Sequence, residues 1–456
     1  MTTLLLKNAD VLLTMGEEPT QIPGGGLFVQ DNVIEAIGPS DELPEEADEV
    51  IDARGMVVLP GLINTHHHMY QTLTRALPGS QDESLFDWLT RLYPVWGEMS
   101  DEAVYTSAFV GMAELVLSGC TTSSDHLYIY PNDSTLDSTI RAAQEIGLRF
   151  HPTRGSMSFG QSAGGLPPDH LVEDEGDILI DSRRVIEQYH DSKPYSMLRV
   201  GLSPCSPFSV TGSLMRESAE MARNYEKVTL HTHVAETQDE EIFCLAEFGE
   251  RPAEYMRQLG WVGPDVWWAH AIYLNDDEIQ MLAETKTAVA HCPTSNMLLG
   301  SGIAKVRQMR RAGVNVGIAV DGSASNDGND ILLETRMAML LQRVLTGAWT
   351  FSVMDAFELA TVGSAAVLGR EDLGQLSPGM AADFIGISTD RLEMAGAAVH
   401  DPVASLLLCA PRGVDFSVIN GKIVVQGGQL KDVDLEGVVA KHNELAGAMA
   451  AKHPLQ

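Results

Sequence analysis

The sequence predicts an α/β protein, a (β/α)8 or TIM barrel joined to a small β-sandwich domain that both termini build. Eight apolar, strand-like runs alternate with helical stretches through the middle of the chain. Nearly every run begins apolar and ends in His, Asp, Glu, Ser or Cys. A TIM barrel explains this, because its active site lies at the C-terminal ends of the strands. A sandwich or a doubly wound sheet does not predict polar groups at the same end of eight successive strands.

Both ends of the chain have the sequence pattern of short strands separated by turns. Residues 1–58 contain three strand-like segments, and residues 375–430 contain similar ones with turn signals at Asn420-Gly421 and Gly427-Gly428. We therefore expect both ends to form one small β-domain. Residues 59–374 are then the barrel, and residues 431–456 are a C-terminal helical tail.

The eight runs of the barrel alternate with segments of 3.6-residue periodicity. One such segment, 101–119, ends with a glycine at the position where helices often stop. In chain order the runs are VVLPGLINTHHH, GCTTSSDHLYI, GLRFHPTRGSMS, LRVGLSPCSPFSV, KVTLHTHVAET, DVWWAHAIYL, TAVAHCPTSN and NVGIAVDGSASN.

Composition excludes several classes of protein. The 456 residues are 44% hydrophobic without low-complexity tracts, which is typical of a globular chain, and no apolar run approaches the roughly 20 residues of a membrane span. Five scattered cysteines and no recognisable signal peptide predict reduced thiols and a cytoplasmic protein. A formal net charge of −33 argues against nucleic acid as a partner. Composition leaves open whether the chain forms a homo-oligomer.

Three consecutive histidines follow the first run. Side chains alternate across a strand, so His66 and His68 share one face and His67 points to the other. His66 and His68 can grip a metal if they face the barrel interior, while His67 packs outward. An isolated H-x-H pair is often ordinary packing, so the prediction depends on the other strand ends.

The fifth and eighth runs supply further donors. His231 and His233 share a face in HTHVAET, with His233 nearer the C-terminal rim and His231 one layer deeper, and Asp321 ends the eighth run. Together, His66, His68, His233 and Asp321 form a nitrogen and oxygen set that suits one divalent metal, Zn²⁺ preferred and Fe²⁺ as the alternative. Such a metal lowers the pKa of water to about 7.

Groups for proton transfer lie close to these donors in sequence. Glu236 is three residues after His233 and is a candidate proton shuttle, and Asp321 can take the proton of the attacking water. His270, at the end of the sixth run, is a candidate to hydrogen-bond the attacking oxygen. His291 ends the seventh run, and the sequence supports two interpretations equally: it lines the site, or it packs in the core.

The motifs PGLINTHHH, HTHVAET, WAHA, AHCPTSNMLLGSG and VDGSASND occur in this order. Together they resemble the amidohydrolase superfamily, in its mononuclear branch of cytosine, guanine and S-adenosylhomocysteine deaminases, over essentially the whole chain. The resemblance implies metal ligands at His66, His68, His233 and Asp321, with Glu236 and His270 catalytic. The fourth run, GLSPCSPFSV, lacks the lysine of the binuclear branch, which fits a single metal.

The resemblance also suggests a substrate class. Gln71 stands at the offset where guanine deaminases place a glutamine that binds the purine edge, and an amide complements a ring N–H beside a C=O. In the fourth run, guanine deaminases carry an arginine-phenylalanine pair where this chain has SPCSPF, and adenosine-type relatives place a histidine where Cys205 falls. We expect a cytoplasmic hydrolase that deaminates a free purine-like base, 8-oxoguanine preferred, with isocytosine, guanine and hydroxy-s-triazines as alternatives.

Further pocket candidates rest on residue type alone. Tyr70, Trp88 and Phe208 can stack on a ring, although an aromatic residue is more often packing. Arg154, Cys205 and His291 are candidate substrate contacts. The Gly- and Ser-rich loop 154–169 is either a lid or a flexible surface loop.

Overall fold

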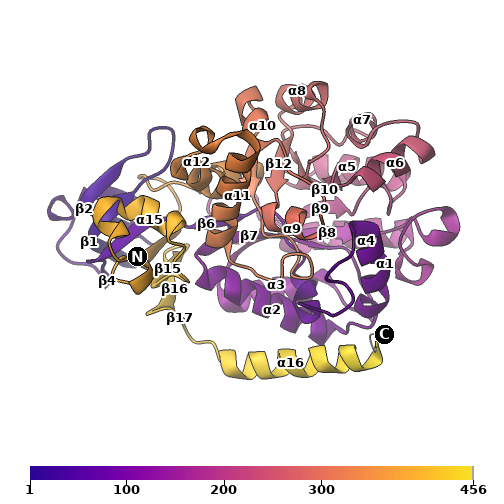
Figure 1. The fold of residues 1–456 in the computed structure, drawn as a ribbon. Coiled ribbons are helices and arrows are strands. Elements are labelled where there is room, and N and C mark those ends of the chain that lie inside the picture. Colours follow the sequence, from indigo (N-terminus) through magenta and orange to yellow (C-terminus); the bar gives the residue numbers. More distant parts are fainter. Residues whose placement is uncertain (454–456) are drawn as a thin grey trace.

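A computed structural model describes residues 1–453, so the last three residues of the predicted tail lie outside it (Figure 1). Eight parallel strands form one sheet in the order in which they occur along the chain. Each predicted run contains one of them, and the predicted TIM barrel is confirmed. The strands are β6 (Leu62–Asn64), β7 (Cys120–Leu127), β8 (Arg149–Ser156), β9 (Gly201–Pro204), β10 (Thr229–Val234), β11 (Val266–His270), β12 (Ala288–His291) and β13 (Val316–Ile318).

The barrel closes where its first and last strands meet. The Thr65 N–H donates to the Ile318 carbonyl at 3.0 Å, and the Asp321 N–H donates to the His66 carbonyl at 3.2 Å. Two of the predicted metal ligands thus lie where the barrel closes, although 255 positions separate His66 from Asp321 in the sequence (321 minus 66).

Helices connect the strands and cover the barrel (Figure 1). Caps fix several of them: the Ser100 hydroxyl accepts from the Ala103 N–H at the start of α2, and a capping box of Asn275 and Glu278 starts α8. The α-helices before the tail are α1 (Leu85–Trp96), α2 (Asp101–Leu117), α3 (Leu136–Ile146), α4 (Glu175–Tyr189), α5 (Gly212–Arg223), α6 (Gln238–Glu247), α7 (Pro252–Gln258), α8 (Asp276–Thr285), α9 (Pro293–Leu298), α10 (Val306–Ala312), α11 (Ile331–Thr346), α12 (Val353–Glu358), α13 (Ser364–Val367), α14 (Ala397–His400) and α15 (Pro402–Leu408).

A second sheet of nine strands combines the two ends of the chain. Its central pair joins β5 to β14, antiparallel, so residues 56–60 lie beside residues 384–388. An ion pair between the buried Arg149 and Asp383, at 2.9 Å, ties this sheet to the barrel. The strands are β1 (Thr3–Leu13), β2 (Gln21–Gln30), β3 (Val33–Pro39), β4 (Glu49–Asp52), β5 (Met56–Pro60), β14 (Phe384–Ser388), β15 (Phe416–Ile419), β16 (Lys422–Gln426) and β17 (Gln429–Leu430).

The chain leaves this sheet in a long helix, α16 (Leu435–Lys452), which runs along α2 at the outside of the barrel (Figure 1). Val438, His442, Leu445 and Met449 recur at helical spacing and form its buried or half-buried face. Within residues 1–453, no helix combines the length and the apolarity needed to cross a membrane.

Candidate metal centre and active site

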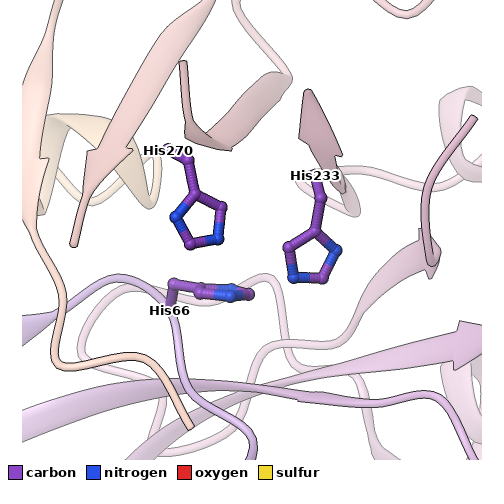
Figure 2. A group of neighbouring side chains, drawn as sticks. All are labelled: His66, His233 and His270. Atoms are coloured by element: carbon purple, nitrogen blue, oxygen red, sulfur yellow. The ribbon is translucent and has the colours of Figure 1, made fainter. Parts of the chain in front are cut away.

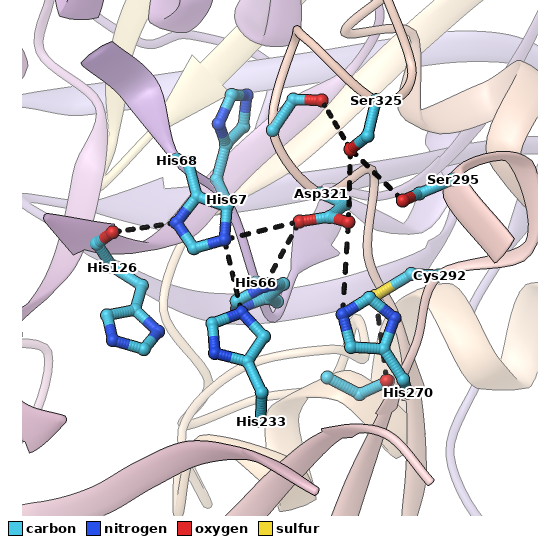
Figure 3. Close-up of polar contacts among 12 residues, drawn as sticks. His66, His67, His68, His126, His233, His270, Cys292, Ser295, Asp321 and Ser325 are labelled. Atoms are coloured by element: carbon cyan, nitrogen blue, oxygen red, sulfur yellow. Dashed lines mark hydrogen bonds and ion pairs between the residues drawn. The ribbon is translucent and has the colours of Figure 1, made fainter. Parts of the chain in front are cut away.

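The predicted metal ligands come together at the C-terminal end of the barrel (Figure 3), and Figure 2 shows two of them, His66 and His233, beside His270. Asp321 Oδ1 lies 3.1 Å from His66 Nε2 and 3.4 Å from His68 Nε2. His68 Nε2 lies 3.2 Å from His233 Nε2. All four side chains are at most 7% exposed. Four donor atoms from three separate strand ends therefore converge on one small volume.

Backbone carbonyls fix which ring nitrogens of His68 and His233 carry a proton. His68 Nδ1 lies 2.8 Å from the His126 carbonyl, and His233 Nδ1 lies 2.7 Å from the Cys205 carbonyl. A carbonyl oxygen only accepts, so each Nδ1 must donate. In a neutral imidazole the other nitrogen is then unprotonated. The Nε2 lone pair of His68 faces the Asp321 carboxylate, and that of His233 faces His68 Nε2.

The same reasoning applies to His66 through a second histidine. His231 Nδ1 donates to the Trp267 carbonyl at 3.0 Å, so its Nε2 is an acceptor. His66 Nδ1 lies 2.7 Å from that acceptor and must be the donor. The His66 Nε2 lone pair therefore also faces Asp321. His231, one layer below the ligands as expected, orients a ligand.

The charge states of these groups suit a cation. Burial lowers the pKa of His66, His68 and His233, so the imidazoles are neutral. Burial alone would raise the pKa of Asp321, but the neighbouring imidazoles lower it well below its ordinary value. Three lone pairs and a carboxylate oxygen would repel one another without a positive charge between them, and His66 Nε2 and Asp321 Oδ1 are buried without a hydrogen-bond partner. The donor set fits a divalent metal.

His67 points away from the other two histidines (Figure 3). Its Nε2 lies 3.0 Å from the side-chain amide of Asn329, and burial lowers its pKa to about 3. The alternation of side chains along the strand thus separates the two predicted metal ligands from His67, which packs on the other side.

The two predicted proton-transfer residues lie beside the ligands. His270 Nε2 is 3.6 Å from Glu236 Oε2 and 3.9 Å from Asp321 Oδ2. Burial lowers the pKa of His270, but the nearby carboxylates outweigh this effect and raise it above its ordinary value. Burial raises the pKa of Glu236 to about 7. One small polar group could contact all three side chains.

Several of these residues lie in the left-handed region of backbone conformation. Ala235, His270, Ala271 and Asp321 have φ values of 56°, 68°, 48° and 65°. Residues other than glycine rarely adopt this conformation, and such strain concentrates at functional sites. These turns aim the side chains at the ends of β10, β11 and β13 into one volume.

Sequence reasoning missed the residues that hold these groups in place. Asn296 Oδ1 accepts from His270 Nδ1 at 2.9 Å, and the Ser325 hydroxyl donates to Asp321 Oδ2 at 3.3 Å. The Glu240 carboxylate accepts the N–H groups of Ala235 and Glu236 at 2.9 and 2.7 Å. Thr237 followed by Glu240 has the spacing of a helix-capping box, a signal that could have pointed to Glu240.

A small cavity opens beside the predicted metal ligands. Among residues 1–453, no Lys or Arg lines it, and much of its wall is aromatic or aliphatic. Helix α1 supplies one wall. The lining residues are His68, Gln71, Leu85, Trp88, Leu89, Tyr93, Tyr128, Cys205, Ser206, Phe208, His233, Glu236, His270, Leu299, Asp321 and Ser325.

Gln71 is buried in the short 3₁₀ helix η2 (Met69–Thr74) directly after the triple histidine. Its amide makes only long contacts, from the Ala324 N–H at 3.3 Å and to the Tyr70 hydroxyl at 3.4 Å. A side chain at Gly322 would overlap the Gln71 amide, so glycine at this position lets the amide keep its place. The amide therefore retains hydrogen-bonding capacity toward the cavity that it lines.

Other predicted contacts differ in their placement. Trp88, Cys205 and Phe208 line the cavity; the Trp88 indole N–H donates to the Ala324 carbonyl at 3.1 Å, and burial raises the pKa of the Cys205 thiol to about 12. Tyr70 is outside the lining and packs against Trp96, with ring centroids 5.3 Å apart.

Arg154 and His291 are not brought to the cavity. The Arg154 guanidinium is bound by Glu173 and Asp181, at 2.7 and 2.9 Å, and stacks on Tyr130, so it holds β8 to the segment that follows it. His291 is fully buried at the end of β12 and is absent from the lining. None of the lining residues comes from the loop 154–169, and α1 forms the wall that this loop was expected to form.

Comparison with known proteins places this site in a family. A model of the amidohydrolase family matches residues 57–424, which include every residue of the site. The chain belongs to the amidohydrolase family. It is 44% identical to an 8-oxoguanine deaminase of Pseudomonas aeruginosa, over 94% of this chain and 95% of the relative. It is 38% identical to a hydroxydechloroatrazine ethylaminohydrolase of Pseudomonas sp. strain ADP, over 95% and 93% of the two chains.

A solved structure leads to the same conclusion. An atrazine chlorohydrolase of Arthrobacter aurescens TC1, complexed with zinc, superposes with a TM-score of 0.92 at 33% identity, covering 97% of this chain and 100% of that one. The resemblance drawn from the motifs and the expectation of a hydrolase that acts on C–N bonds are confirmed. Members of this family bind a divalent metal, and the histidine cluster at the strand ends fits one.

Proposed function

We propose that this amidohydrolase is a zinc-dependent deaminase of a free, uncharged purine-like base, with 8-oxoguanine as the preferred substrate. The observation that carries the proposal is the shared cavity: Glu236, His270 and Asp321 line the same space as the uncommitted amide of Gln71. The 44% identity to an 8-oxoguanine deaminase supports this choice of ring.

The character of the cavity favours a neutral ring over a nucleotide. No Lys or Arg of the described chain lines it, so it offers no basic side chain to bind a phosphate. Trp88, Phe208 and Leu89 offer apolar surface to a planar ring. Gln71 can donate to a ring carbonyl and accept from the adjacent ring N–H.

The overall reaction replaces a ring C–NH₂ by C=O, consumes one water and releases ammonia. His66, His68, His233 and Asp321 would hold a divalent metal, which would supply a Lewis acid and lower the pKa of water to about 7. Asp321 Oδ2 faces His270 and takes a proton from the attacking water, while His270 hydrogen-bonds the attacking oxygen. Glu236 gives a proton to the neighbouring ring nitrogen. As the C–N bond breaks, the proton on Asp321 passes to the departing amine, and the hydroxyl proton returns to Glu236 as C=O forms.

A screen of ring substrates tests this proposal. The purified protein is assayed for bound metal and for ammonia release from 8-oxoguanine, guanine and isocytosine, and for ethylamine release from hydroxyatrazine. We expect zinc, and the highest kcat/KM for 8-oxoguanine with urate as product. Ethylamine release alone would favour a triazine hydrolase instead, in line with the 38% identity to the ethylaminohydrolase. Fully metal-loaded protein that releases no amine from any of the four would refute the proposal.

A further inference from the structure

The C-terminal helix α16 contacts the short helix that carries Gln71. His442 lies among Val438, Leu445 and Met449 on the buried or half-buried face of α16. Its Nε2 lies 2.9 Å from Thr72 Oγ1, and Thr72 is the neighbour of Gln71 in η2. A polar group that is buried on an apolar helix face destabilises the packing unless it forms a hydrogen bond. The hydrogen bond to Thr72 is therefore what makes His442 acceptable at this position.

The hydrogen bonds around Thr72 leave one role for His442. The Ser107 hydroxyl donates to the Met69 carbonyl at 2.8 Å, so its proton is used. Thr72 Oγ1 lies 3.0 Å from the Ser107 carbonyl and 2.7 Å from the Ser107 hydroxyl, so the Thr72 proton goes to Ser107 in either case. Thr72 Oγ1 is then an acceptor toward α16, and His442 Nε2–H donates to it.

These contacts fix the turn from outside the barrel. The Thr72 N–H donates to Ser107 Oγ at 3.1 Å, and Thr72 and Ser107 are both essentially fully buried. On the other side of the turn, Thr74 Oγ1 donates to the Gln71 carbonyl at 2.9 Å and accepts from the Trp96 indole N–H at 3.1 Å. The backbone of Gln71 is therefore held between α1 and the pair of helices α2 and α16.

We propose that His442 is a positioning residue for substrate binding, through which the C-terminal helix sets the place of the Gln71 amide in the active-site cavity. The inference rests on the proposed function for the role of Gln71, but the contact itself does not. Through His442, α16 would contribute to substrate binding although the helix lies outside the barrel.

Hydrogen exchange and kinetics together test this inference. In His442→Ala we expect amide exchange in the peptide 69–75 to accelerate roughly 2- to 10-fold, as loss of one net hydrogen bond implies, and KM to rise by a similar factor with a smaller change in kcat. His442→Gln, whose amide can donate to Thr72, should restore most of both. Lys441→Ala is the matched control, because it changes the neighbouring residue of α16 and removes only its surface ion pairs with Glu102, at 3.3 Å, and Glu444, at 3.6 Å.

A double-mutant cycle separates positioning from general stability. If His442 acts through Gln71, the effect of His442→Ala on KM should vanish in a Gln71→Ala background. Exchange in 69–75 that matches the wild type, or equal losses in His442→Ala and Lys441→Ala, would overturn the inference. If the wild-type protein turns over none of the rings, the proposed function fails, while the exchange rates still decide whether His442 holds the turn.

Discussion

His231 should control metal affinity without touching the metal. Its Nε2 accepts the proton of His66 Nδ1 at 2.7 Å, deep in the barrel. In His231→Phe the ring remains, so stacking on the Trp267 indole, now at 4.4 Å between centroids, can persist. What is lost is the acceptor that keeps the His66 proton on Nδ1 and the Nε2 lone pair turned toward the metal.

The size of the effect follows from where the proton can go. In the metal-free variant, His66 can move its proton to Nε2, which faces Asp321 at 3.1 Å, and no N–H is left unpaired. Metal binding forces the proton back to Nδ1, now buried without a partner. An unpaired buried donor costs about 1–3 kcal/mol. This free-energy cost arises only in the metal-bound state. Substitutions of residues that hydrogen-bond to a metal ligand lower metal affinity about 10- to 100-fold.

Competition with a chelator of known affinity measures this directly. The control is His151→Phe: His151 is equally buried, lies 5.5 Å from the same indole and hydrogen-bonds only Thr229, away from the ligands. We expect similar losses of Tm in both variants, and a Kd for zinc raised about 10- to 100-fold only in His231→Phe. Equal zinc affinities in the two variants would refute the assignment of ring protons.

Four further outcomes are expected. Glu236→Gln should keep its full metal content and lose about 10²–10⁴-fold in kcat, measured as ammonia release, and an active variant would exclude Glu236 as the shuttle. His67→Ala should lower Tm while metal analysis still finds one equivalent, because the ring packs on the side away from the ligands. Gly322→Ala should raise KM, since the added methyl group displaces the Gln71 amide; unchanged KM would show that this amide does not bind substrate. Burial raises the pKa of Glu334 from 4.5 to about 7, so its contribution to stability is present below pH 4.5 and declines as the pH rises through 7. Chemical denaturation at pH 5 and pH 8 should show a smaller loss of stability in Glu334→Gln than in the wild type.

The parts of the site that follow strand geometry could be predicted from the sequence. Side chains alternate along a strand, which predicts that His67 points away from His66 and His68. Functional residues of a barrel lie at the C-terminal ends of its strands, which predicts that Asp321 lies near them. These predictions need only the direction of each strand. For the same reason all eight runs locate a strand correctly, although short β6 and β13 cover only part of their runs.

Other features depend on contacts that have no local signal. Arg154 also ends a strand, but Glu173 and Asp181 further along the chain bind its guanidinium. Whether α1 or the loop 154–169 covers the cavity is decided by packing, which periodicity does not describe. The left-handed turns at His270 and Asp321 oppose the ordinary preference of these residues and are imposed by the assembled barrel.

Two of the three proposed histidine ligands are oriented by main-chain carbonyls, those of residues 126 and 205. A carbonyl is present whatever side chain the position bears. Cys205 therefore separates two tasks within one residue: its backbone serves the metal, while its side chain lines the cavity. Exchange of that side chain can alter which ring fits without moving the metal, so new substrates can be reached by single substitutions in a barrel whose catalytic centre stays intact.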